Sequence, residues 1–248
     1  MQFKALALIL LAAAPAVLAA PAPGAKVKVN SDLRINPDGW TPVYADYIGH
    51  MKSRFVNKPV TVADASAANT KTGYFVEGNN NSDDLFMGLM REVTGLAPNQ
   101  HYKMDWNINM TSPFGDDCFG VGGSPGGSNY VKIGGATAKP VVVQTRTASG
   151  DFWTFAAPFD HGHQADDGKD MSTVSNISVP GQACEGTSFG PVPTIRDLRN
   201  KPVKTDAKGS LWAVVGIDSG FEGVTGVYWQ QIGIELIPVS EEEAQFPF

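Results

Sequence analysis

Ten consecutive residues alternate strictly between apolar and polar side chains. From residue 102 to 111, every second position is apolar: Tyr102, Met104, Trp106, Ile108 and Met110. Successive side chains of a β-strand point to opposite faces of the sheet, so this period predicts a strand with one buried face. A similar period near the C-terminus places Tyr228, Ile232, Ile234 and Leu236 on one face, with Gln231 and Glu235 on the other.

Shorter apolar runs bounded by Gly and Pro predict further strands. They lie at 60–63, 73–77, 129–133, 140–146, 151–156 and 210–217. Residues 85–94 fit either a helix capped by Ser82 or a strand; Gly88 and the turn at 95–99 favour a strand paired with 101–111. Many short strands joined by Gly/Pro turns predict an all-β fold, a single β-sandwich, jelly-roll-like, with long Gly/Pro-rich loops.

The N-terminus has the features of a cleavable signal peptide. Lys4 precedes an apolar run that closes on small residues, which predicts a signal peptide over 1–19. We expect a flexible segment at 20–30, one β-sandwich domain at 31–238 and an acidic, solvated tail at 239–248. The protein is then secreted, or periplasmic in a Gram-negative bacterium, and the sequence offers no transmembrane segment.

The charge balance bears on partners. The net charge is −6, and cleavage after residue 19 would remove Lys4 and make it about −7. Nucleic acid and anionic membranes are therefore not expected as partners, because both favour basic clusters. Cations and sugars remain compatible with this balance.

The two cysteines, Cys118 and Cys184, predict a disulfide in an exported chain. The alternative is a pair of free, buried thiols. If the source is eukaryotic, N-x-Ser/Thr sequons make Asn80, Asn109 and Asn176 candidate glycosylation sites.

Two acidic loops are candidate metal sites. Asp83 and Asp84 end an Asn-rich segment, and Asp160 and Asp170 bound a loop that also holds His161-Gly-His163. Carboxylates and amides are ligands that Ca²⁺ uses, so calcium is the expected cofactor if there is one. An ordinary turn and a solvated loop are the alternatives. The His-x-His pair would suit Zn²⁺ but lacks a third ligand with a recognisable spacing.

Asp218 and Glu222 are the candidate catalytic residues, since two carboxylates near a strand end could perform acid–base chemistry. A tight turn that uses the glycines beside them is the alternative. Residues 120–128, with five glycines, lack the strand–helix context of a phosphate-binding loop and predict a long structural loop.

Tryptophans could form a sugar-stacking surface. Trp229 is expected to be exposed, because its neighbours Tyr228 and Ile232 were assigned to the core face. Trp153 is the second candidate ligand-binding residue. Trp106 and Trp212 lie within strand patterns and are expected in the core.

Three motifs occur together: GNNNSDDLFM at 78–87, GVGGSPG at 120–126 and DSGFEG at 218–223. With Gly168-Lys169-Asp170 between the last two, they resemble a family of exported, uncharacterised proteins, often described only as hypothetical proteins or lipoproteins. The resemblance covers most of residues 40–237 and implies a compact β domain without a known activity. The histidines at 161 and 163 depart from that pattern, which favours oxygen ligands over zinc.

Export, acidity and the missing nucleophile–base motif together favour a secreted, non-catalytic binding domain for an extracellular glycan or cell-surface polymer. An extracellular carbohydrate-active enzyme, a hydrolase or lyase, is the first alternative. A structural surface protein is the second. Convergence of the acidic residues in one groove would favour the enzyme.

Overall fold

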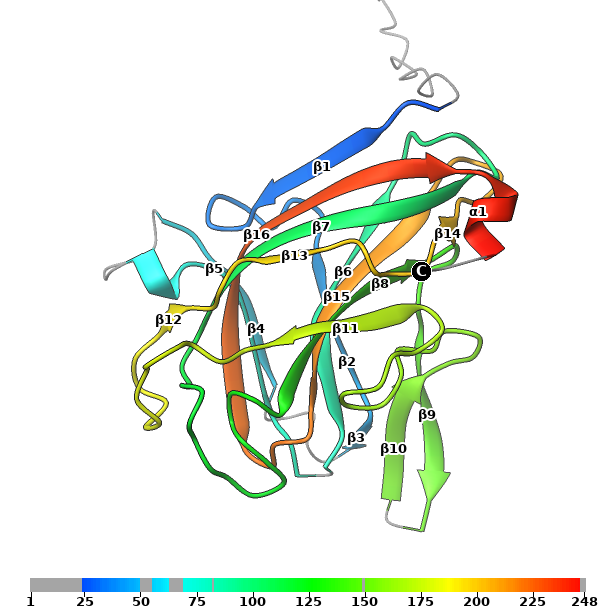
Figure 1. The fold of residues 1–248 in the computed structure, drawn as a ribbon. Helices are drawn as coiled ribbons and strands as arrows, with labels where there is room; N and C mark the ends of the chain where they lie inside the picture. The colour runs from blue at the N-terminus through cyan, green and yellow to red at the C-terminus, as the bar shows by residue number, and fades with distance from the viewer. Residues whose placement is uncertain (1–23, 50–54, 63–68, 82, 149, 246–248) are drawn as a thin grey trace, which may run out of the picture.

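The protein is almost entirely β-structure, as the sequence predicted. The computed structural model describes residues 24–49, 55–62, 69–81, 83–148 and 150–245. The expected signal peptide, 1–19, lies outside these ranges. Two antiparallel sheets pack face to face, and a small third sheet covers part of one of them (Figure 1).

The larger sheet has eight strands and is built around β7 and β16. Its members are β1 (Val27–Asp32), β4 (Val56–Val60), β5 (Gly73–Asn79), β7 (His101–Ser112), β12 (Gly190–Pro191), β13 (Ile195–Asp197), β14 (Val203–Lys204) and β16 (Val224–Val239). A short 3₁₀ turn, η2 (Asn69–Lys71), precedes β5.

The smaller sheet has five strands in the order β11-β8-β15-β6-β2. They are β2 (Thr41–Ala45), β6 (Leu85–Val93), β8 (Asn129–Ala136), β11 (Met171–Asn176) and β15 (Leu211–Ser219). The third sheet has the order β3-β10-β9, with β3 (Tyr47–Ile48), β9 (Val142–Thr147) and β10 (Gly150–Phe155). Chain segments repeatedly cross between the two main sheets, as in jelly rolls.

The main core lies between the two large sheets. The alternating residues of β7 all point into it, which confirms the predicted strand and its buried face. Trp106, Ile108 and Met104 meet Ile133, Val215 and other apolar side chains of the smaller sheet in one cluster.

The final strand required a correction of register. Trp229 pairs with Met110 and Gln231 pairs with Asn109, so the ladder shifts between Trp229 and Gln231. A bulge reverses which side chains face the core. Ile232 keeps its predicted inward position, but Trp229 is fully buried and Tyr228 is not. The prediction that Trp229 is exposed was therefore wrong.

The predicted pairing of 85–94 with 101–111 was also wrong, although both are strands. β6 pairs with β15 and β2 in the smaller sheet, whereas β7 belongs to the larger one. The connection crosses the sandwich and buries Leu96, whose N–H donates to Gly209 O at 3.0 Å. β6 is buried on both faces over its first six residues, which is typical of a central, covered strand.

That covered outer face carries a second apolar cluster. Phe86, Met90 and Val214 project from the smaller sheet and meet Phe155 and Phe159 from β10 and the loop after it. Trp212 packs partly against the same cluster. The third sheet is therefore fixed on the outside of the sandwich, with its hairpin end extending beyond it (Figure 1).

Both ends of the described chain are more ordered than predicted. β1 begins at Val27, inside the segment expected to be flexible, and pairs with β16 from Val27↔Leu236 onward. The acidic tail forms the short helix α1 (Glu241–Gln245). Ser240 caps it: its hydroxyl accepts from the N–H of Glu243, whose carboxylate accepts from the N–H of Ser240.

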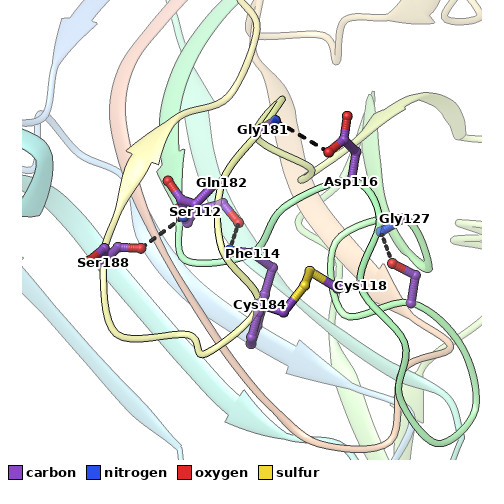
Figure 2. The surroundings of a disulfide bond; sticks show 10 residues. Ser112, Phe114, Asp116, Cys118, Gly127, Gly181, Gln182, Cys184 and Ser188 are labelled. Atoms are coloured by element: carbon purple, nitrogen blue, oxygen red, sulfur yellow. Dashed lines mark hydrogen bonds between the residues drawn. A yellow bond between two sulfur atoms is a disulfide. The ribbon is translucent and has the colours of Figure 1, made fainter.

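The predicted disulfide is confirmed. Cys118 and Cys184 are bonded, with their Cα atoms 5.5 Å apart (Figure 2). The bond joins the loop after β7 to the loop after β11, and the side chain of Gln182 donates to Ser112 O and Ser188 O beside it. Closing a loop of this length is worth roughly 4 kcal/mol in the chain-entropy account. Residues 120–128 form the expected long loop next to Cys118.

The register of β16 can be tested with two adjacent substitutions. Ile234→Asp should unfold the protein or nearly so, because Ile234 is 2% exposed in the core and would bury an unpaired charge. Glu235→Ala should cost less than about 1 kcal/mol, because its contacts to Lys26 and Lys28 are surface ion pairs. Urea unfolding measures both. Similar losses for the two variants would contradict this register.

Candidate functional site

A lysine lies fully buried on the outer face of the smaller sheet. Lys132 stands in the middle of β8, between Val131 and Ile133, which face the main core. Its ammonium group donates to His161 O and Asp166 O, both at 2.8 Å, and lies 3.2 Å from a carboxylate oxygen of Asp218. These three contacts match the three N–H donors of a lysine.

His161 occupies the next position in the same network. Its Nδ1 lies 3.2 Å from Asp218 Oδ2 and its Nε2 lies 2.7 Å from Asp46 Oδ2. A ring with a carboxylate at each nitrogen is best satisfied as imidazolium, which donates from both. Burial alone lowers the pKa of His161, but the hydrogen bonds and charges of Asp218 and Asp46 outweigh it and raise the pKa to about 9.

Asp84 adds a fifth ionisable group, and we call these five residues the buried charge cluster: Asp46, Asp84, Lys132, His161 and Asp218. Lys132 and His161 already balance Asp46 and Asp218. Burial, followed by the charges of Asp218 and Asp46, raises the pKa of Asp84 to about 7. A protonated Asp84 can donate to Asp218, whose Oδ1 has no other hydrogen-bond partner among the described residues.

The cluster holds the third sheet in place. Thr154 on β10 donates its hydroxyl to Asp46 Oδ1 at 2.5 Å, and the ring of Phe155 contacts His161. Asp46 has a φ of +58°, a left-handed conformation between β2 and β3. β3 then pairs with β10, with Tyr47 opposite Trp153.

An aromatic groove results from this attachment. Its volume is about 400 Å³, and it runs between β2, an edge strand, and the β9–β10 hairpin. The rings of Tyr47 and Trp153 lie parallel, with centroids 6.1 Å apart, and those of Tyr44 and Phe55 stack at 4.2 Å. We use "aromatic groove" for this cavity and these four rings.

The rings of the groove are held rigidly. The hydroxyl of Tyr44 lies 3.0 Å from Val56 O and 3.3 Å from Glu77 O, either of which can accept its proton. Burial raises the pKa of Tyr44 well above its usual range, so the group stays neutral. Phe55 meets Tyr47 edge-on at 4.8 Å. Tyr47 is only 3% exposed and supports the wall, whereas the partly exposed rings of Trp153, Tyr44 and Phe55 can contact the apolar face of a planar or ring-shaped ligand with little loss of entropy.

The structure separates the two tryptophans proposed for ligand binding. Trp153 lines the groove and is half-buried. Trp229 is in the core, as described above. Trp106 is in the core as expected. Trp40, for which the sequence made no prediction, is also in the core, and its indole N–H donates to Ser31 Oγ.

The candidate catalytic pair is not brought together. Asp218 is fully buried in the charge cluster, whereas Glu222 is exposed in the following loop. Asp84 is the acidic residue that joins Asp218, and its side chain is 25% exposed. His163 is 64% exposed, with its Nε2 3.6 Å from Asp84, so the two histidines of His-x-His lie in different surroundings.

The other proposed metal ligands have partners within the protein. Asp160 accepts from the N–H groups of Gly162 and Lys169, and Asp170 accepts from the N–H of Asp160 at 2.8 Å. Asp83 is exposed. Within the described ranges, no three His, Cys, Asp or Glu side chains form a metal-ligating group. Calcium binding stays a prediction.

One glycosylation candidate is wrong. Asn80 is 1% exposed, and its amide nitrogen, where a glycan would attach, donates to Ser219 O and Phe221 O. Asn109 and Asn176 are half-buried and stay predictions.

Comparisons with known proteins do not show a family for this chain. No family model matches it, and no curated protein matches it. Among solved structures, the K3 cleaved adhesin domain of Lys-gingipain from Porphyromonas gingivalis W83 aligns with 85% of this chain and 98% of its own, at 12% identity and a TM-score of 0.37. This likeness is too low to support an inference about function. The resemblance to an exported family stays a prediction.

Sequence reasoning missed several residues of the site. Lys132 is the only charge in the run Tyr130–Ala136, and Asp46 interrupts the apolar run Val43–Ile48, so each breaks a strand pattern. Such interruptions are signals of a buried polar contact. Tyr44 and Phe55 carried no comparable signal, because their groove is assembled from five separate stretches of the chain: 42–47, 55, 90, 139–142 and 153. No helix among the described residues is long and apolar enough to cross a membrane.

The charge cluster predicts a pH-dependent stability. The raised pKa values mean that the folded state binds more protons than the unfolded state. Ionisation of Asp84 should therefore lower the free energy of unfolding as pH rises from about 4 through about 7. His161 makes its full contribution to the free energy of unfolding below about pH 6.5, and this contribution is lost as pH rises through about 9.

Asp84→Asn isolates the lower window, because the amide cannot ionise. Between pH 4 and pH 8, the free energy of unfolding of the variant should rise relative to that of wild type by on the order of 2 kcal/mol. This figure is reduced from the full pKa shift because Asp84 is partly exposed. Urea unfolding of both proteins across this range gives the difference curve. A difference that does not change with pH would contradict the assignment of Asp84.

Proposed function

We propose that the protein is a secreted, non-catalytic domain that binds an extracellular glycan in the aromatic groove. The observation that carries this proposal is the half-buried indole of Trp153 in the wall of the groove, which lies parallel to the buried ring of Tyr47 and beside the stacked Tyr44 and Phe55. Aromatic faces provide the apolar contact that the C–H face of a sugar ring needs.

The position of the groove supports a chain-shaped ligand. It lies along an edge strand and beside a projecting hairpin, and its volume of about 400 Å³ is within the range of ligand sites. Val141 and Val143 on the hairpin side remain 54% and 37% exposed, which extends the apolar surface. An open groove of this kind can hold a few sugar units of a longer polymer.

The test is to remove the half-buried tryptophan of the groove, Trp153. A glycan array of plant, fungal and bacterial polysaccharides first identifies a ligand, and titration calorimetry then gives the dissociation constant. Trp153→Ala should weaken binding at least about tenfold, since a half-buried indole contributes a large contact area.

Phe119→Ala is the matched control. Phe119 is an aromatic residue, 98% exposed, in the loop at Cys118 and outside the groove. Its loss should leave the dissociation constant unchanged. Equal effects of the two substitutions, or no bound glycan at all, would refute the proposal.

A carbohydrate-active enzyme is the second candidate, and Asp84 is the observation that favours it. A partly exposed carboxyl with a pKa of about 7, beside the carboxylate of Asp218, is suited to act as a general acid. His163 at 3.6 Å could stabilise its ionised form. The sequence-based pair of Asp218 and Glu222 is replaced by Asp84 and Asp218 in this hypothesis.

Product assays separate the two candidates. Incubation of wild-type protein with the bound glycan should release no reducing or unsaturated ends if the protein only binds. Release that disappears in Asp84→Asn, with binding retained, would establish the enzyme instead. Glu222→Gln serves as the control, because Glu222 is exposed and lies outside the buried charge cluster.

A further inference from the structure

A second cavity adjoins the aromatic groove. Its volume is about 550 Å³, and its walls come from four segments of the chain, 135–141, 156–159, 169–170 and 201–204, together with His101. Lys139, Pro140 and Val141 line both cavities. The two spaces are therefore neighbours across the short segment that leads into β9.

The charge of this cavity is opposite to that of the protein. Its lining includes Lys139, Lys169, Lys201 and Lys204 but a single acidic residue, Asp170. Asp170 is engaged with the N–H of Asp160. The chain as a whole carries a net charge of −6, so this concentration of ammonium groups is local. We call it the basic cavity.

The protein itself places a carboxylate against this cavity. Glu241, at the start of α1, lies 3.5 Å from the ammonium of Lys204 and 3.3 Å from Nδ1 of His101. The carboxylate of Glu241 is 66% exposed and is not among the lining groups. The contact shows that Lys204 and His101, at this end of the cavity, are placed to pair with a carboxylate.

The remaining surface of the cavity is apolar. Pro140, Pro158 and Phe159 line it, and Phe159 is packed against Phe155. The ammonium of Lys139 lies over the ring of Trp212, 5.1 Å from its centroid. An apolar floor under a cationic rim suits a ligand with one hydrophobic face and an anionic substituent.

We propose that the basic cavity binds an acidic sugar unit of the glycan that the aromatic groove holds, so that the protein selects anionic over neutral polysaccharides. This inference rests on the proposed function and adds the class of ligand. The anionic group, a carboxylate or a sulfate, contacts Lys169 and Lys204, and the neighbouring units stack in the groove. Without such a group, the lysines would offer a neutral glycan only hydrogen bonds that water also provides.

The decisive probes are pairs of glycans that differ only in charge. Oligogalacturonate is compared with its methyl ester for carboxylate, and dextran sulfate with dextran for sulfate. At low salt, the anionic member of at least one pair should bind at least tenfold more tightly, and the preference should fall as salt screens the lysines. The pair that shows the preference identifies the anionic group.

Variants then locate the preference in the cavity. Lys169→Gln with Lys204→Gln, at two lysines that line the basic cavity and not the groove, should weaken binding of the anionic member about tenfold and leave the neutral member unchanged. Lys58→Gln is the control, because Lys58 is exposed on β4 and lines neither cavity. Glu241→Gln should tighten anionic binding about threefold, by freeing Lys204 from an exposed ion pair. Circular dichroism confirms that each variant is folded.

The outcomes distinguish this inference from the function on which it rests. Equal binding of both members of each pair, lost in Trp153→Ala, would overturn the basic cavity and leave the groove in place. A charge preference that survives the double lysine substitution would also overturn it. Anionic binding that needs the lysines but not Trp153 would overturn the groove instead, and absence of any binding would overturn both.

Discussion

The fully buried ammonium group of Lys132 is the constraint on which the outer layer of this protein depends. A charge removed from water is costly unless it is paired and hydrogen-bonded, and breaking such a pair leaves the other charge uncompensated. Lys132 meets this requirement only when the loop carrying His161 and Asp166 closes over β8. The loop is therefore held by a polar requirement as well as by the apolar contacts of Phe155 and Phe159.

The closed loop also fixes the positions of residues at the surface. His161 links the carboxylates of Asp218 and Asp46, and Asp46 accepts from Thr154 on β10. Trp153, the residue before Thr154, is thereby placed opposite Tyr47. The same loop leads through Lys169 to the wall of the basic cavity. One buried network thus positions both cavities to which we assign ligands, which is a reason for the fold to retain so many charges beneath its surface.

The sequence was most informative where one physical rule acted alone. The alternation in β7 predicted its buried face correctly, because a half-buried strand has only two faces and only one can meet the core. The same rule failed in β16 at Trp229, because a single bulged residue reverses the alternation without leaving a mark in composition. Strand pairing failed for β6 and β7, since a turn that suits a hairpin also suits a crossing between two sheets.

The sequence by itself determined the β-class of the protein and the pairing of its two cysteines, because these follow from local periodicity and from a count that leaves one combination. It also pointed to Trp153 and to two acidic residues of the charge cluster, Asp84 and Asp218, but not to Asp46. Only the tertiary structure decided which of them meet. Asp46, Asp84 and Asp218 lie far apart along the chain. Asp46 and Asp218 meet because they neutralise the buried Lys132 and His161, and Asp84 joins them with a pKa raised to about 7. Such long-range compensation of charge depends on the packed arrangement of strands, which no local pattern contains.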